Sequence, residues 1–304
     1  MRKAVIDIGT NSVKLIIGER SAEGEAKTLC DVSVITKLGE GLKESGKLGE
    51  AAMARTAAAI IKLAQFAKAQ GACETECVGT MALRTASNSQ EFIALVKSQD
   101  GPEIRIISGE EEAELSSAAI LGSIEGAKSG KTLIFDTGGG STEFVAAENG
   151  ITKKTFSVPV GAVTLTDANF KEKPADPKKV CKVIAELTET FTGAGVEKDS
   201  GNVIGAGGNV TAIATVAAGL AEYDPVKIHG SVLTRTEVMR QTAIYTRCTD
   251  AELRSIPGLP PKRAEVILGG ACIILAAMEA AGAEKITVSD RSLRHELLAR
   301  SLEG

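Results

Sequence analysis

The sequence predicts an α/β fold made of two related halves. Stretches rich in β-branched residues alternate with alanine-rich stretches whose apolar residues recur at helical spacing, which is typical of sheets covered by helices. Three strand-like stretches end in glycine-rich turns, at residues 7–12, 136–142 and 205–209. The length of 304 residues favours two domains over one.

The first two of these turns share a pattern that defines the halves. Residues 7–12 and 136–141 both read Asp-x-Gly-x-x-Ser between two β-rich runs, and they align without a gap. A repeat at this spacing indicates two copies of one structural unit. We therefore predict a first domain at 1–123 and a second at 124–292, with the C-terminal helix 293–304 packing back on the first.

The elements of the first half follow in order. The β-rich runs on either side of the first turn lie between residues 3 and 19. Alternating periodicity then predicts helix 51–69, strand 75–78, helix 89–96, strand 104–107 and helix 110–121.

The second half continues the alternation. Its predicted strands are 132–135, 143–147, 153–158, 203–204 and 286–288. Its predicted helices are 162–169, 177–191, 210–220, 262–281 and 293–302. A charged loop with two prolines, 169–179, separates the first two of these helices.

Composition excludes several classes of function. A net charge of −4 argues against a DNA-binding protein held by bulk charge, and no apolar run has the length of a membrane span. The start of the chain does not resemble a signal peptide, so we expect a cytoplasmic protein. The six cysteines and two histidines lack the spacing of a zinc site.

Glycine-rich turns after strands favour phosphate binding, because a bare backbone can bring its N–H groups close to oxygen. A plain hairpin turn is the alternative. No Walker A motif is present, and Gly138–Gly140 lead into a strand, which does not fit a dinucleotide-binding turn. Asp7 and Asp136 stand at matching turns, and two carboxylates can hold Mg²⁺, with Mn²⁺ as an alternative.

The motifs also resemble a known family. AVIDIGTNS and FDTGGGSTE resemble the actin/sugar-kinase/heat-shock-chaperone fold. Within that fold the chain resembles the exopolyphosphatase and guanosine pentaphosphate phosphohydrolase (Ppx/GppA) family, in its short two-domain form. GTMALRTASN, ISGEEEA, VIGAGGNVTAIA and IPGLPPKRAEVI carry the resemblance through the chain. It implies two actin-like (ribonuclease H-like) domains flanking a central phosphate-binding cleft.

The resemblance also implies site residues. Glu112 would be the general base, Arg84 would bind the phosphate being cleaved, and Glu143 would support the metal or the attacking water. The implied metal ligands are Asp7, Asp136 and Glu111. The implied phosphate-binding residues are Thr10, Asn11, Ser12, Gly138, Gly139, Gly140, Ser141, Thr142, Gly207 and Gly208.

Each of these roles has a plainer alternative. The acidic run Glu110–Glu112 could simply compensate a helix dipole, Arg84 could be a surface arginine, and Glu143 could face solvent. The run Lys171, Lys173, Lys178, Lys179 and Lys182 is interpreted as a solvated face, with a track for polyanions as the alternative. Ser289, Asp290 and His295 lie too close in sequence for a hydrolase triad.

The expected function is that of an Mg²⁺-dependent exopolyphosphatase that releases orthophosphate from inorganic polyphosphate. The same chemistry on guanosine pentaphosphate (pppGpp) is the nearest alternative. A kinase of the same fold and a non-catalytic phosphate sensor are further alternatives. The expected partners are polyphosphate or pppGpp, with a homodimer left open, and neither DNA nor a membrane.

Overall fold

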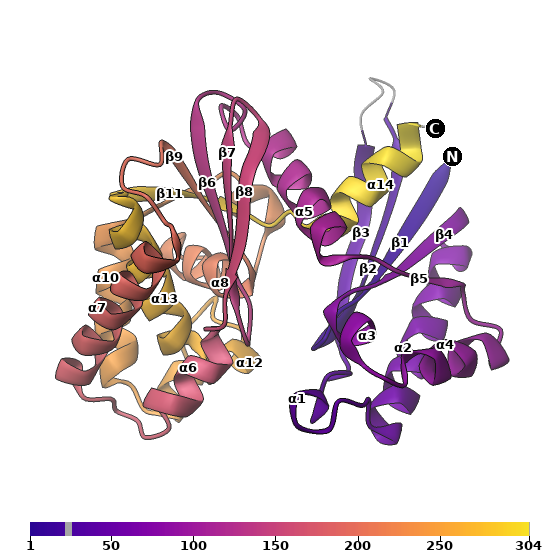
Figure 1. The fold of residues 1–304 in the computed structure, drawn as a ribbon, viewed down its shortest axis with the longest axis horizontal. Helices are drawn as coiled ribbons and strands as arrows, with labels where there is room; N and C mark the ends of the chain where they lie inside the picture. Colours follow the sequence, from indigo (N-terminus) through magenta and orange to yellow (C-terminus); the bar gives the residue numbers. More distant parts are fainter. Residues whose placement is uncertain (22–25, 304) are drawn as a thin grey trace. The chain divides into compact units, whose positions relative to one another are not determined.

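The computed structural model describes residues 1–21 and 26–303 (Figure 1). The chain forms two compact units. One contains residues 1–119 and the end of the chain from Ser292, and the other contains Ile120–Arg291. Each unit has one sheet with helices packed on it, so the predicted α/β class is confirmed. The predicted boundary after residue 123 is the end of helix α5, whereas the units divide within this helix, after Ala119.

The first unit is built on a five-stranded sheet in the order β3-β2-β1-β4-β5. Strand β1 is antiparallel to β2 and parallel to β4, and β4 is parallel to β5. The strands are β1 (Arg2–Ile8), β2 (Ser12–Arg20), β3 (Ala26–Ile35), β4 (Ala72–Gly79) and β5 (Ile104–Ile106). The helices are α1 (Leu42–Ser45), α2 (Glu50–Ala69), α3 (Met81–Thr85), α4 (Ser89–Ser98), α5 (Gly109–Ser123) and α14 (Leu293–Glu303).

Alternation along the strands gives this sheet two buried faces. Ile6 and Leu15 belong to the core shared with α2 and α4, while the neighbouring Val5 and Ile16 belong to the core shared with α14. Successive strand residues point to opposite faces, so both faces need apolar side chains. Helix α14, yellow in Figure 1, lies against β1 and β2.

The second unit is built on a six-stranded sheet in the order β10-β11-β9-β6-β7-β8. Strand β6 is antiparallel to β7 and parallel to β9. The strands are β6 (Lys131–Thr137), β7 (Thr142–Glu148), β8 (Ile151–Val158), β9 (Asn202–Ala206), β10 (Val232–Thr234) and β11 (Lys285–Ser289). The helices are α6 (Ala162–Asn169), α7 (Pro177–Ala194), α8 (Gly208–Ala217), α9 (Pro225–Ile228), α10 (Arg235–Arg247), α11 (Asp250–Arg254), α12 (Pro261–Ala264) and α13 (Ile267–Ala281).

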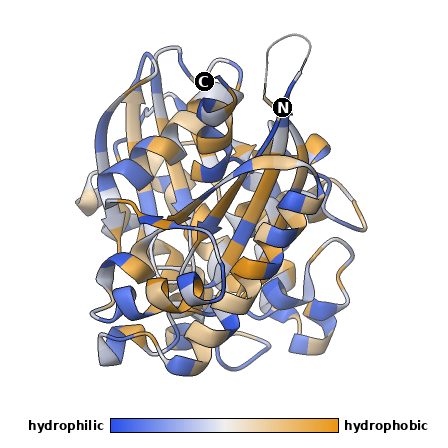
Figure 2. Cartoon of the chain, turned by 90° about the vertical axis from the view of Figure 1, so that its right-hand side faces the viewer, coloured by the Kyte–Doolittle hydropathy of each residue, from blue (hydrophilic) through white to orange (hydrophobic). Residues whose placement is uncertain are grey.

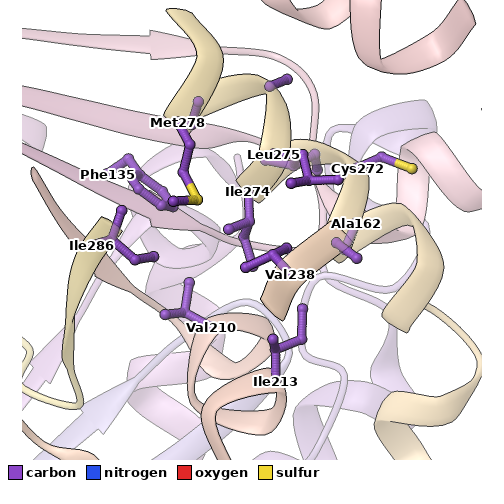
Figure 3. Packing of buried hydrophobic residues seen from close by; sticks show 14 of the residues in the cluster. Phe135, Ala162, Val210, Ile213, Val238, Cys272, Ile274, Leu275, Met278 and Ile286 are labelled. Carbon is purple, nitrogen blue, oxygen red and sulfur yellow. The ribbon is translucent and has the colours of Figure 1, made fainter. Parts of the chain in front are cut away.

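Helix α13 lies at the centre of the main core of this unit. Nearly all of its residues are buried, and it contacts α6, α7, α8 and α10. Figure 3 shows Met278 of α13 close to Phe135 of β6 and Ile286 of β11. In Figure 2 the helices at the molecular surface carry both hydrophilic and hydrophobic residues, as expected where one side of a helix covers a sheet. None of the helices in the described residues is long and apolar enough to cross a bilayer.

One predicted element is wrong. The helix expected at 262–281 is two helices, because α12 ends at Ala264 and α13 begins only at Ile267. Val266, with φ −117° and ψ 1°, leaves the helical conformation between them.

Candidate active site

The two units carry the same hairpin after their central strand. In the first unit the N–H of Gly9 donates to the carbonyl of Ser12 at 3.0 Å. In the second, the N–H of Gly138 donates to the carbonyl of Ser141 at 2.9 Å. A β-carbon at either glycine would lie within 3.3 Å of that serine oxygen. The sequence repeat is therefore a repeat of backbone geometry.

The glycine loop of the second unit is anchored through its carbonyl groups. The carbonyls of Gly138 and Gly139 accept hydrogen bonds of 2.9 Å from the N–H groups of Ala162 and Val163, at the start of α6. Gly161 allows this contact, because a β-carbon there would lie 2.3 Å from the carbonyl carbon of Gly139. The helix N-terminus is thus occupied by the loop itself.

Two N–H groups of the same loop, those of Gly139 and Gly140, are free in the described part of the chain. Within residues 1–21 and 26–303, nothing accepts a hydrogen bond from the N–H of Gly139 or Gly140. A β-carbon on Gly140 would meet nothing within 4 Å. Free amide donors beside open space are a feature of backbone anion-binding sites, which is the geometry that the predicted phosphate-binding role requires.

Glu143 is fixed next to this loop by two hydroxyl groups. Its Oε1 accepts hydrogen bonds from Ser141 Oγ at 2.5 Å and from Ser157 Oγ at 3.0 Å. Glu143 also stands directly across the hairpin from Asp136. Glu143 is therefore a partly buried, hydrogen-bonded carboxylate.

The third glycine loop, residues 205–209, contacts Asp136. Gly207 has φ 97°, which favours glycine, and a β-carbon there would lie 2.6 Å from Asp136 Oδ1. A β-carbon on Gly208 would lie 2.1 Å from Nη2 of Arg263, so this guanidinium packs against bare backbone. Burial lowers the pKa of Arg263, and the charge of Asp136 opposes that shift.

Arg263 is a site residue that sequence reasoning missed. It belongs to the motif IPGLPPKRAEVI, to which we assigned no role, so the motif itself was the available signal. An arginine is a bidentate donor to oxyanions, and this one lies beside Gly208, a predicted phosphate-binding glycine.

In the first unit, Asp7 is a buried carboxylate with an unused oxygen. It is 5% exposed, and Oδ1 has no hydrogen-bond partner among the described residues. Burial, together with the charges of Asp7 and Glu76, raises the pKa of the neighbouring Cys77. A buried carboxylate oxygen without a donor suits a cation ligand.

Arg84 and Glu112 meet near the ends of the parallel strands of this unit. Arg84 lies on α3 after β4, and Glu112 lies on α5 after β5. Arg84 Nη1 donates to Glu112 Oε2 at 3.0 Å and to the carbonyl of Ile107 at 3.0 Å. Both side chains are 30% exposed, so each remains accessible to a ligand.

The two other glutamates of the acidic run are placed differently. Glu111 binds Arg105 at 2.5 Å, and Arg105 also binds Glu76 at 3.0 Å. The pKa of the exposed Glu110 is lowered, first by hydrogen bonds to its own backbone N–H and then by Ser108. Only Glu112 forms an ion pair with Arg84.

The predicted metal ligands do not form a ready-made cluster. Across residues 1–21 and 26–303 there is no group of three His, Cys, Asp or Glu side chains that could hold a metal ion. Asp7 and Asp136 belong to different units.

Residues of the rejected hydrolase triad and of the lysine run form ion pairs elsewhere in the structure. Nδ1 of His229 lies 3.1 Å from Asp290, and Nε2 of His295 lies 3.4 Å from Asp31. Lys173 is not solvated, since its side chain is 5% exposed and pairs with Asp250. The interpretation of the lysine run as a solvated face is wrong at this position.

Comparison with known proteins gives one consistent family. The sequence profile of the Ppx/GppA phosphatase family matches residues 19–304. Exopolyphosphatase 2 of Mycobacterium tuberculosis is 29% identical, and the match covers 100% of this chain and 99% of that protein. The bifunctional 3-dehydroquinate synthase/phosphatase of Fusobacterium nucleatum is 30% identical over 99% of this chain, which spans only 46% of that protein.

A further relative and a solved structure agree with this family. The guanosine-5'-triphosphate,3'-diphosphate pyrophosphatase of Photobacterium profundum is 30% identical over 97% of this chain and 58% of its own length. The crystal structure of the Aquifex aeolicus member of the Ppx/GppA family superposes with a TM-score of 0.87. It is 30% identical, and the match covers 99% of this chain and 97% of that one.

Proposed function

The chain belongs to the Ppx/GppA phosphatase family, and from this premise we propose that it is an exopolyphosphatase. It hydrolyses the terminal phosphoanhydride of inorganic polyphosphate and releases orthophosphate. Similarity over full length to exopolyphosphatase 2 of Mycobacterium tuberculosis supports this substrate.

The ion pair between Arg84 and Glu112 is the observation that carries the proposal. Arginine binds phosphate oxygens in pairs, and an adjacent carboxylate can accept a proton from water. A phosphate group held by Arg84 would therefore lie close to a base. The Gly139 and Gly140 amides supply further donors for phosphate oxygens in the second unit.

The reaction uses these residues as follows. Glu112 takes a proton from water, and the water oxygen forms a bond to the terminal phosphorus. The bond from that phosphorus to the bridging oxygen breaks, and this oxygen stays on the shortened chain. In the first unit Arg84 and Ser12 would hold phosphoryl oxygens, and in the second unit Ser141 and the loop amides would do so.

In each unit the aspartate of the hairpin, Asp7 or Asp136, would be a ligand for Mg²⁺, with Mn²⁺ as an alternative, and the unused Oδ1 of Asp7 supports this assignment. When bound, the ion would neutralise charge on the phosphate oxygens. The ion pair of Glu111 with Arg105 makes it a poorer ligand than the two aspartates.

The second candidate is hydrolysis of pppGpp, which the similarity to the Photobacterium profundum enzyme favours. Arg263 beside Gly208 gives the second unit a cation that could bind an additional phosphate group. Both candidates use the same phosphoanhydride chemistry.

A phosphate-release assay tests the proposal. Purified protein is given polyphosphate or pppGpp with Mg²⁺, and in parallel with EDTA. We expect release from polyphosphate at the higher kcat/KM, complete loss in EDTA and recovery on adding Mg²⁺. Faster release from pppGpp would select the second candidate. Phosphate transfer from ATP to an added acceptor, without release from polyphosphate, would indicate a kinase.

A further inference from the structure

Lys173 is a buried lysine with no role in the chemistry described so far. It lies in the loop between α6 and α7, and its side chain is 5% exposed. An ammonium group is costly to bury unless its donors are satisfied. Its Nζ has three acceptors: Asp250 Oδ1 at 2.8 Å, the Glu265 carbonyl at 3.1 Å and the Ala264 carbonyl at 3.5 Å. These match the three donors of lysine.

Two of the three acceptors belong to the end of α12. This helix has only four residues, too few to be stable without external contacts. Lys173 binds the carbonyl groups directly after Arg263, where a cation also complements the helix dipole. The other ion pair at this end, Arg254–Glu265 at 3.1 Å, joins two exposed side chains and contributes little.

Arg263 depends on this short helix for its position. Its guanidinium packs against Gly208, and the charge of Asp136 also acts on it. Its position beside the third glycine loop therefore depends on the backbone of α12, which Lys173 holds at the two residues directly after Arg263.

We propose that Lys173 is a positioning residue that holds α12 so that Arg263 presents its guanidinium to a substrate phosphate. The inference rests on the phosphate-binding role proposed for Arg263. Lys173 itself touches no substrate, because its three donors are used within the protein.

A double-mutant cycle tests this coupling. Tripolyphosphate is titrated calorimetrically into wild type, Lys173→Met, Arg263→Ala and the double variant, and Tm is measured for each. We expect Arg263→Ala to raise Kd about tenfold, the usual loss for a charged hydrogen bond. Lys173→Met should raise Kd severalfold alone and not at all in the Arg263→Ala background.

Tm separates positioning from general loss of structure. A merely structural lysine would lower Tm and weaken binding equally in both backgrounds, which would overturn the inference. An unchanged Kd in Lys173→Met, or in Arg263→Ala, would also overturn it. Lys198→Met, an exposed lysine of the same unit, is the control and should keep the wild-type Kd.

The proposed hydrolysis is judged separately. Phosphate release by the wild type from polyphosphate decides whether the protein is an exopolyphosphatase. The Kd values of the four proteins for tripolyphosphate do not depend on turnover. They therefore test the role of Lys173 independently of the phosphate-release assay.

Discussion

At the scale of single residues, neighbouring glutamates of one helix have different partners. Glu111 faces Arg105 of β5, whereas Glu112 faces Arg84 of α3. Successive helical residues are about 100° apart around the axis, so neighbouring glutamates of the run contact different parts of the unit. Both side chains are partly exposed, 41% for Glu111 and 30% for Glu112, so the identity of the arginine partner distinguishes them.

Glu112→Gln should keep the size and hydrogen-bonding capacity of the side chain but remove the base. We expect kcat for phosphate release to fall by about two to four orders of magnitude, with KM and Tm nearly unchanged. Glu110→Gln, in the same helical turn but exposed, is the control. Turnover by Glu112→Gln close to that of the wild type would remove this residue from the mechanism.

Gly140→Ala and Gly161→Ala separate binding from folding. A β-carbon on Gly140 meets no protein atom within 4 Å, so Tm should hardly change while KM rises, because the methyl group enters the space of a bound phosphate. A β-carbon on Gly161 would lie 2.3 Å from Gly139, so Tm should fall by several degrees. Equal KM for wild type and Gly140→Ala would mean that this glycine is needed only for the conformation of the turn and not for phosphate binding.

Local patterns revealed some site residues and not others. Asp7 and Asp136 could be predicted because the hairpin that places each is encoded by its own neighbours. Arg263 could not, because its contact with Gly208 joins positions far apart in the sequence. The motif IPGLPPKRAEVI marks the segment but assigns no contact to Arg263.

At the scale of elements, the C-terminal helix α14 is fastened to the edge strand β3. Arg294 donates to the two oxygens of Asp31 at 3.1 and 2.7 Å, and His295 Nε2 lies 3.4 Å from the same carboxylate. Burial alone would raise the pKa of Asp31, but the His295 hydrogen bond and the Arg294 ion pair outweigh it and hold this pKa well below its usual range.

Asp31→Asn should therefore lower Tm at neutral pH. A depressed pKa stabilises the fold above the unfolded-state value of about 3.9, and the contribution is lost as pH falls below it. The Tm difference between wild type and Asp31→Asn should narrow as pH decreases below about 4. A Tm difference that is constant from pH 7 to pH 3 would show that the charge of Asp31 contributes nothing.

Elements with strong periodicity were predicted well, and those without it were not. The alanine-rich α2 spans Glu50–Ala69 against a prediction of 51–69. Strand β3 was missed because it is an edge strand exposed along nearly its whole length, so its sequence lacks a buried face. Helix α10 was missed because several of its buried residues are polar, among them Gln241, Thr242 and Thr246.

At the scale of the whole molecule, the two units repeat one hairpin but differ in what surrounds it. The first adds Arg84 and Glu112, and the second adds Glu143 and Arg263. The net charge of −4 gives no general attraction for a polyanion. We therefore expect phosphate binding to depend on the local donors of each unit.

The central claim is that the protein hydrolyses polyphosphate from its ends. The position of the first cleaved bond tests it most directly. A terminal phosphate has one more non-bridging oxygen and more negative charge than an internal one. The donors of each unit, Arg84 in the first and the Gly139 and Gly140 amides in the second, should therefore prefer the chain end. Polyphosphate labelled at its terminal phosphates is incubated with the protein and resolved on a gel over time. We predict labelled orthophosphate from the first samples, with chains shortening one unit at a time. Mid-length labelled fragments early in the reaction would contradict terminal hydrolysis.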